Sequence, residues 1–317
     1  MPRRARTLRR QALAALVVAG GLALAFALLR YAHLDNRVLR WTHGLAPGNE
    51  WNRSRWRGAS LWLPGYEYDI YARQVDVDDN LSGLDYDEEN GRLLAVVNRP
   101  AQLLVLDERG RVRQRHRLRG ASDVEAVAWL GHDRVALLQE GRRSILVVEL
   151  PRADGQDIHV QDARTIPLVL DAGGNDGPEG LAYDAAGDVL YIAKERDPTA
   201  LYTLHGVLGK GALRQEDRSD WLASLGFATD ISSLDFDPRS RHLLLLSDES
   251  QLMAELDSDG RPVSWRPLAT SGLHLPVPQA EGIAVDPRGT VYVVSEPNLF
   301  YRLRPATAVS GGRHAAP

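Results

Sequence analysis

Glu179-Gly-Leu-Ala-Tyr-Asp184 is one copy of a short pattern that recurs along the chain and decides its fold. The pattern reads acidic residue or Ser, small, apolar, any, aromatic or apolar, and usually Asp. The other four copies lie at 82–87, 125–129, 232–237 and 281–286. Successive copies start 43, 54, 53 and 49 residues apart, which suits four short strands with their turns. We therefore expect a structure built from repeated four-stranded units.

Further apolar strand patterns follow each copy and align between the units. Second strands are expected at 92–98, 134–140, 189–195, 242–248 and 290–296. Third strands are expected at 101–107, 144–150, 200–206, 251–257 and 299–305. Fourth strands are less regular, at about 112–118, 158–168, 212–221 and 262–268. The fifth unit has no fourth strand of its own.

An alternating strand at 68–77 precedes the first unit and has no partner there. Used as the outer strand of the last unit, it closes a ring and leaves no large open sheet edge. We therefore predict an all-β fold, a five-bladed β-propeller over 66–305, followed by a flexible tail over 306–317. A six-bladed ring is the alternative, because the connection over 206–229 could hold another strand pair.

Acidic residues gather at one end of the predicted ring. The innermost strand and the next strand run antiparallel, so the start of one and the end of the other lie on the same face. Seven of ten residues at these positions are carboxylates, and the two columns are Ser82, Glu125, Glu179, Ser232 and Glu281, and Asn98, Glu140, Glu195, Asp248 and Glu296. Asn80, Asp123, Asp230 and Gln279 precede the first column and add further oxygen ligands.

Several carboxylates around one narrow mouth cannot all remain ionised without a cation or raised pKa values. Oxygen ligands without His or Cys favour a hard ion, and a roomy ring suits Ca²⁺ better than Mg²⁺. We therefore expect Ca²⁺ as the cofactor. The alternative is that these carboxylates cap backbone N–H groups or pair with Arg99, Arg142 or Arg196 and only join the blades.

These segments resemble the SdiA-regulated family of bacterial envelope proteins. The resemblance lies in Asn80–Leu84, Gly180–Asp184 with Ala193–Pro198, Asp230–Ser232 with Leu246–Ser250, and Gln279–Gly282 with Val294–Asn298. It implies a five-bladed propeller distantly similar to NHL-repeat proteins, an N-terminal membrane segment and a Ca²⁺ site, but no known activity. The metal role carries over to matching acidic positions, Glu125, Glu179, Glu195, Asp248, Glu281 and Glu296. Glu140 matches least well, because the second unit departs from the pattern there.

The first thirty residues predict a membrane anchor. Five Arg residues within residues 1–10 precede an apolar run from Ala12 to Leu29, long enough as a helix to cross a bilayer. The charge bias predicts a cytoplasmic tail over 1–10, a transmembrane signal-anchor over 11–30 and a juxtamembrane spacer over 31–65. The protein would then be a single-pass protein of the inner membrane with its propeller in the periplasm. A cleaved signal peptide is the alternative.

Charge and composition narrow the function. Residues 1–40 carry a net charge of +7 and the remainder −11, so a nucleic-acid-binding body is not expected. The chain contains no Cys, which excludes disulfides and a Cys nucleophile. We expect a calcium-binding propeller that binds a small-molecule or protein ligand at the acidic mouth. Two alternatives are a Ca²⁺-dependent hydrolase of the lactonase or esterase type at the same site, and a purely structural role.

Overall fold

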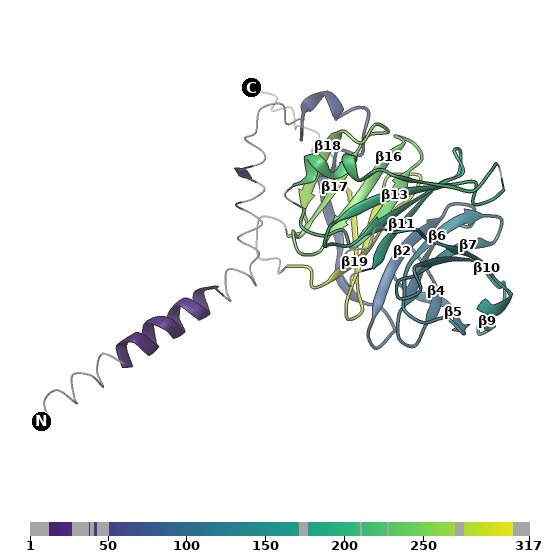
Figure 1. The fold of residues 1–317 in the computed structure, drawn as a ribbon, viewed down its shortest axis with the longest axis horizontal. Helices are drawn as coiled ribbons and strands as arrows, with labels where there is room; N and C mark the ends of the chain where they lie inside the picture. Colours follow the sequence, from purple (N-terminus) through teal and green to yellow (C-terminus); the bar gives the residue numbers. More distant parts are fainter. Residues whose placement is uncertain are drawn as a thin grey trace, which may run out of the picture.

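Five sheets pack side by side in a ring in the computed structural model, which describes residues 13–26, 38, 41–42, 51–170, 177–209, 211–226, 228–269 and 276–306 (Figure 1). The innermost strands contact one another in cyclic order and back to the first, and they are β2 (Leu81–Asp87), β6 (Val124–Gly131), β11 (Pro178–Asp184), β15 (Ser233–Asp237) and β19 (Ala280–Val285). The predicted all-β, five-bladed propeller is therefore confirmed.

The other strands follow the innermost strand outward in each blade. Blade 1 continues with β3 (Arg92–Val97), β4 (Gln102–Leu106) and β5 (Val112–Arg119). Blade 2 has β7 (Arg134–Gln139), β8 (Ser144–Glu149) and β10 (Arg164–Pro167). Blade 3 has β12 (Val189–Lys194), β13 (Ala200–His205) and β14 (Arg214–Asp217). Blade 4 has β16 (His242–Ser247), β17 (Leu252–Leu256) and β18 (Pro262–Pro267), and blade 5 has β20 (Val291–Ser295), β21 (Leu299–Pro305) and β1 (Tyr66–Gln74).

Two connections differ from a plain four-stranded repeat. The expected strand at 158–168 is divided, because β9 (Ile158–His159) pairs parallel with β5 of blade 1 while β10 completes blade 2. The connection over 206–229 holds β14 and a short 3₁₀ helix, η4 (Ser219–Leu225), in its described part. The described residues there contain no further strand pair, and five blades result instead of six.

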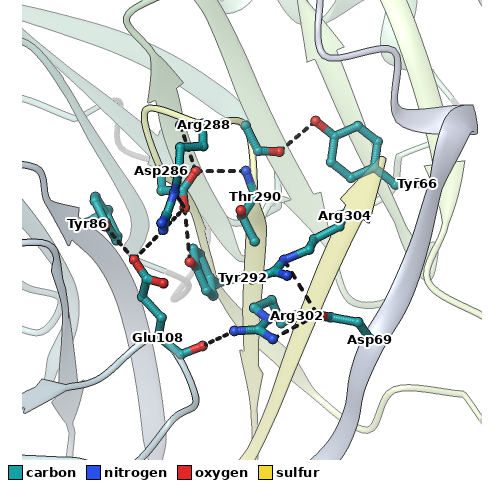
Figure 2. Close-up of polar contacts among 11 residues, drawn as sticks. Tyr66, Asp69, Tyr86, Glu108, Asp286, Arg288, Thr290, Tyr292, Arg302 and Arg304 are labelled. Atoms are coloured by element: carbon teal, nitrogen blue, oxygen red, sulfur yellow. Dashed lines mark hydrogen bonds and ion pairs between the residues drawn. The ribbon is translucent and has the colours of Figure 1, made fainter. Parts of the chain in front are cut away.

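The ring is closed by the strand that precedes the first blade. β1 pairs antiparallel with β21, so blade 5 is built from both ends of the propeller sequence. Arg302 on β21 strengthens this closure (Figure 2): its guanidinium lies 2.7 Å from Asp69 Oδ2 on β1 and donates to the Glu108 carbonyl oxygen of blade 1 at 2.9 Å. One largely buried guanidinium, 11% exposed, therefore connects the first strand, the last strand and the neighbouring blade.

Apolar side chains fill the spaces between the blades. Each of five buried clusters is shared by two adjacent blades, the fifth of them joining blade 5 to blade 1. There, Tyr86 stacks on Tyr292 with ring centroids 6.0 Å apart and an interplanar angle of 9°. The second residue of the repeat is small, and this allows neighbouring inner strands to pack closely. A Cβ added to Gly282 would lie only 2.9 Å from the Gly83 carbonyl carbon, so a larger residue would clash there. The inner strands thus approach backbone to backbone.

Residues 51–65 pack against blade 4. They include two short 3₁₀ helices, η1 (Ser54–Trp56) and η2 (Leu63–Gly65); a third, η3 (Val160–Asp162), follows β9. Leu63 is fully buried, and its N–H donates to Ser264 Oγ at 3.1 Å. The Leu61 N–H donates to Glu255 Oε1 at 3.0 Å. This part of the predicted spacer over 31–65 is therefore bound to the propeller surface.

The predicted membrane location is wrong. No helix among the described residues is long and apolar enough to cross a bilayer. Within the predicted anchor over 11–30, the structure describes a helix over residues 13–26. This finding overturns the inner-membrane, single-pass assignment with a periplasmic propeller. The predicted tails over 1–10 and 307–317 lie outside the described residues.

Candidate metal centre

The two predicted columns of polar residues lie on one face of the ring, which we call the mouth face. Backbone hydrogen bonds join the start of each inner strand to the end of its neighbour. The Glu140 N–H donates to the Asp123 carbonyl oxygen at 2.9 Å, and the Glu296 N–H donates to the Gln279 carbonyl oxygen at 3.0 Å. Antiparallel pairing therefore places the columns as the sequence predicts.

Three of the predicted carboxylates lie at irregularities of the inner strands. The pairing register shifts between Val124 and Ala126, between Pro178 and Gly180, and between Ala280 and Gly282. The residues left without a ladder partner are Glu125, Glu179 and Glu281. A β-bulge leaves its extra residue unpaired and re-aims its side chain. In these three blades the repeated distortion thus takes the acidic first residue of the pattern out of the strand ladder.

One compact group of carboxylates lies on blade 2 at the mouth face, at the start of β6 and the end of β7. Asp123, Glu125 and Glu140 each offer an oxygen, and these oxygens lie within 4.8 Å of one another. The group is half-buried. The backbone of Asp123 has a φ of 59°, a left-handed conformation that Asp adopts more easily than most residues. The Gly177 N–H donates to Glu140 Oε1 at 2.9 Å and orients that carboxylate.

Asn98 of blade 1 adds a fourth oxygen beside this cluster. Its Nδ2 group donates to Glu125 Oε1. Its Oδ1 atom is buried and has no hydrogen-bond partner among the described residues. Leaving a buried carbonyl-type oxygen unpaired costs about 1–3 kcal/mol, so such an atom beside three carboxylates is suited to a cation. The four side chains form a donor set of oxygen atoms only.

The mouth carboxylates raise one another's pKa values. Burial raises the pKa of Glu125 to about 7, with a further contribution from the charge of Glu140. Burial raises the pKa of Glu179 to about 10, and the charges of Glu195 and Glu281 add to the effect. The pKa of Glu281 is raised to about 8 by burial and by nearby acidic groups. Carboxylates on different blades therefore share one electrostatic environment, which a bound cation would stabilise in the ionised form.

Two of the remaining predicted ligands, Glu195 and Asp248, contact other groups of the protein. Glu195 lies 3.3 Å from the Arg196 guanidinium. Asp248 Oδ1 accepts the N–H of Ala280 in the next blade at 2.8 Å. Burial raises the pKa of Glu296, with the charge of Asp79 as a second cause. Capping and pairing, the alternative expected for the acidic columns, thus describe Glu195 and Asp248, and within the cluster Asp123 also pairs with Arg99 at 3.1 Å.

The compact cluster differs in membership from the predicted metal set. Of Glu125, Glu179, Glu195, Asp248, Glu281 and Glu296, it contains Glu125 alone. For the other five a metal role stays a prediction. The predicted set does not include Asp123, Asn98 or Glu140, although each occupies a polar position next to or within a column. Glu140 matches the repeat least well, yet it lies opposite Asp123 across a strand pair, and this pairing is the feature of the sequence that points to it.

The Asp that ends most copies of the repeat lies on the opposite face and has a structural role. Asp286 Oδ1 accepts the N–H groups of Arg288 and Thr290 at 2.8 Å each, within the turn to β20. Figure 2 shows Asp286 between Arg288, Thr290 and Tyr292. In blade 4 Asp237 accepts the Arg239 N–H at 3.1 Å in the same way. This column closes turns and belongs to no metal cluster among the described residues.

Comparisons with known proteins place the propeller in a described family. A family model described as SdiA-regulated matches residues 58–304. Among solved structures, a streptogramin B lyase has a TM-score of 0.44 at 10% identity, covering 78% of this chain and 100% of that chain. A luciferin-regenerating enzyme has a TM-score of 0.46 at 12% identity, covering 75% and 94%. A gluconolactonase from Xanthomonas campestris has a TM-score of 0.42 at 16% identity, covering 73% and 87%.

Proposed function

The chain belongs to the SdiA-regulated family, and from this membership and the mouth cluster we propose that it is a calcium-binding propeller. Asp123, Glu125 and Glu140 hold the ion, and Asn98 Oδ1 is a further ligand. A small-molecule or protein ligand binds at the same face with the ion as part of its binding surface. The approach of three carboxylate oxygens to within 4.8 Å of one another carries this proposal.

The spacing of the oxygens suits Ca²⁺. This ion binds oxygen at about 2.3–2.6 Å, so two ligands on opposite sides of one ion are roughly 5 Å apart. Oxygens within 4.8 Å of one another can therefore all contact a single ion. Mg²⁺ requires a stricter octahedron and usually keeps several waters, and Zn²⁺ prefers His or Cys ligands, which this donor set does not contain. Water or a bound ligand would supply the remaining oxygens.

Calcium titration tests the metal assignment. Full-length protein freed of metal by a chelator is titrated with CaCl₂ by isothermal calorimetry, and its melting temperature is followed in parallel. We expect one site per chain with a Kd below about 1 mM. We expect Glu140→Gln to weaken binding at least tenfold, because it removes a charged ligand. Glu149→Gln, at an exposed position on β8, is the matched control and should bind like the wild type. Equal affinity of the wild type and Glu140→Gln would refute the proposal.

A Ca²⁺-dependent hydrolase is the second candidate, and the space beside the cluster favours it. A groove of about 800 Å³ extends from Asn98 and Asp123 across blades 1 and 2. A cation next to a groove of this size could polarise a substrate carbonyl. A panel of lactones and aryl esters, assayed with and without chelator, tests this activity. Turnover that calcium restores after chelation supports it, and no chelator-sensitive turnover across the panel rejects it.

A further inference from the structure

The groove beside the metal cluster is strongly basic, in contrast to the cluster itself. Four arginines line it, Arg99, Arg117, Arg119 and Arg142, and Asp123 is the one acidic residue among its lining side chains. Asp123 also belongs to the carboxylate cluster, so the groove opens directly beside the proposed ion. A positive surface and a cation site are therefore continuous on the mouth face.

The strand order of blade 1 brings these arginines to the mouth face. β5 ends on the side where β3 ends and β4 begins, since Arg117 is paired with Gln102 and the Leu118 N–H donates to the Ala101 carbonyl oxygen at 3.0 Å. Arg117 is exposed on this strand end, as is Arg119. Arg99 follows β3, and Arg142 lies between β7 and β8 of blade 2. Three separate segments thus contribute guanidinium groups to one groove.

Acidic residues of the protein neutralise these guanidiniums only in part. Arg99 lies 3.1 Å from Asp123, and Arg119 lies 2.6 Å from Asp157, which is outside the groove lining. Arg142 forms no ion pair with any carboxylate in the described part of the chain. Arg117 forms none there either, although its charge helps to lower the pKa of Asp157. Guanidinium groups present paired N–H donors whose geometry matches phosphate and carboxylate oxygens. The groove therefore offers one guanidinium without a carboxylate partner, Arg142, and three whose charge acidic residues offset in part.

We propose that the ligand of the mouth face is a small organic anion, a phosphate monoester or a carboxylate. Its charged group binds Arg117 and Arg142, and the other end of the molecule contacts the ion held by Asp123, Glu125 and Glu140. The groove volume of about 800 Å³ is suited to a molecule of this kind. This inference rests on the proposed calcium site, and it adds the chemical class of the ligand.

Binding of simple probes to the full-length protein tests the inference. Phenyl phosphate, benzoate and the neutral benzyl alcohol are titrated by calorimetry at fixed ionic strength with saturating CaCl₂. We expect phenyl phosphate or benzoate to bind at least tenfold more tightly than benzyl alcohol, and the tighter of the two anions identifies the charged group. We expect Arg117→Gln and Arg142→Gln each to weaken that anion roughly tenfold, because each removes a charge-assisted hydrogen bond.

Arg113→Gln is the matched control, because Arg113 lies on the same strand four residues before Arg117 and pairs with Asp107 at 2.7 Å. It should leave anion affinity within twofold of the wild type. All three variants should bind Ca²⁺ normally. If the wild type binds Ca²⁺ but neither anion, or if Arg117→Gln and Arg142→Gln bind the anion like the wild type, the inference is overturned and the calcium site stands. If Ca²⁺ fails to bind while the anion still binds through Arg117, the calcium site is rejected and the anion groove stands.

Discussion

Replacing Glu125 by Gln should stabilise the metal-free protein and abolish its response to calcium. Burial and the charge of Glu140 raise the pKa of Glu125 from 4.5 to about 7. Each pKa unit corresponds to about 1.4 kcal/mol, so ionising Glu125 above pH 7 costs the folded state about 3 kcal/mol relative to the unfolded chain. Gln removes this cost and keeps an oxygen that can accept the Asn98 hydrogen bond.

The direction of the pH effect follows from the raised pKa. The protonated carboxyl stabilises the fold fully below pH 4.5, and this contribution is lost as the pH rises to about 7. With chelator at pH 8, Glu125→Gln should therefore melt roughly 6–12 °C above the wild type, since 1 kcal/mol corresponds to about 2–4 °C in a domain of this size. At pH 4.5 and below, the two proteins should melt together.

Thermal melts followed by circular dichroism at both pH values, with chelator or with 1 mM CaCl₂, measure the effect. Calcium should raise the melting temperature of the wild type by roughly 5–10 °C if 1 mM is about 100 times Kd, and it should leave Glu125→Gln nearly unchanged. Glu149→Gln should follow the wild type throughout. A lower melting temperature for Glu125→Gln at pH 8 with chelator, or an equal calcium shift in both proteins, would refute the reasoning.

Three further predictions follow from the mouth and the ring closure. With chelator present, the melting temperature of the wild type should fall as the pH rises from about 5 to 8. The pKa of Glu281 is raised to about 8 in the folded state, so the stability that its protonated form contributes is lost over this range. A melting temperature that rises with pH would contradict this. Gly177→Ala should lower calcium affinity at least tenfold in calorimetry, since its Cβ would lie 2.2 Å from Glu140 Cγ and displace that ligand; an unchanged Kd would argue against Glu140 as a ligand. Arg302→Ala should lower the free energy of unfolding measured in urea by about 2–3 kcal/mol, because the Arg302 side chain is only 11% exposed and its removal leaves Asp69 without this partner. The Arg304 side chain is 48% exposed and its ion pair with Asp69 is 3.5 Å long, so Arg304→Ala should lower the free energy of unfolding by under about 1 kcal/mol. Equal losses for the two variants would show that Arg302 has no special role in closing the ring.

The repeat pattern was sufficient to predict the architecture. Strand pairing between neighbours in sequence is local and periodic, so the spacing of the pattern predicted five blades, closure by an N-terminal strand and a face that gathers the acidic columns. The sequence also indicated which residue types surround the mouth, because antiparallel pairing relates the start of one strand to the end of the next. The same pairing rule leaves the Asp that ends the repeat, such as Asp286, out of the mouth columns, and in the structure Asp286 closes a turn on the opposite face.

The composition of the cluster was decided only by the three-dimensional structure. The approach of its three carboxylates depends on the register shift at Glu125 and on the positive φ of Asp123, both within blade 2, whereas the packing of blade 1 brings Asn98 to Glu125. These features bring Glu140 and Asn98 to the cluster, although the repeat pattern ranked Glu140 lowest. The basic groove likewise needs three segments that are distant in sequence. The sequence therefore determines the ring and the character of its mouth, whereas side-chain positions accurate to a few ångströms arise from local distortions of the strands and from packing between blades, neither of which the repeat pattern specifies.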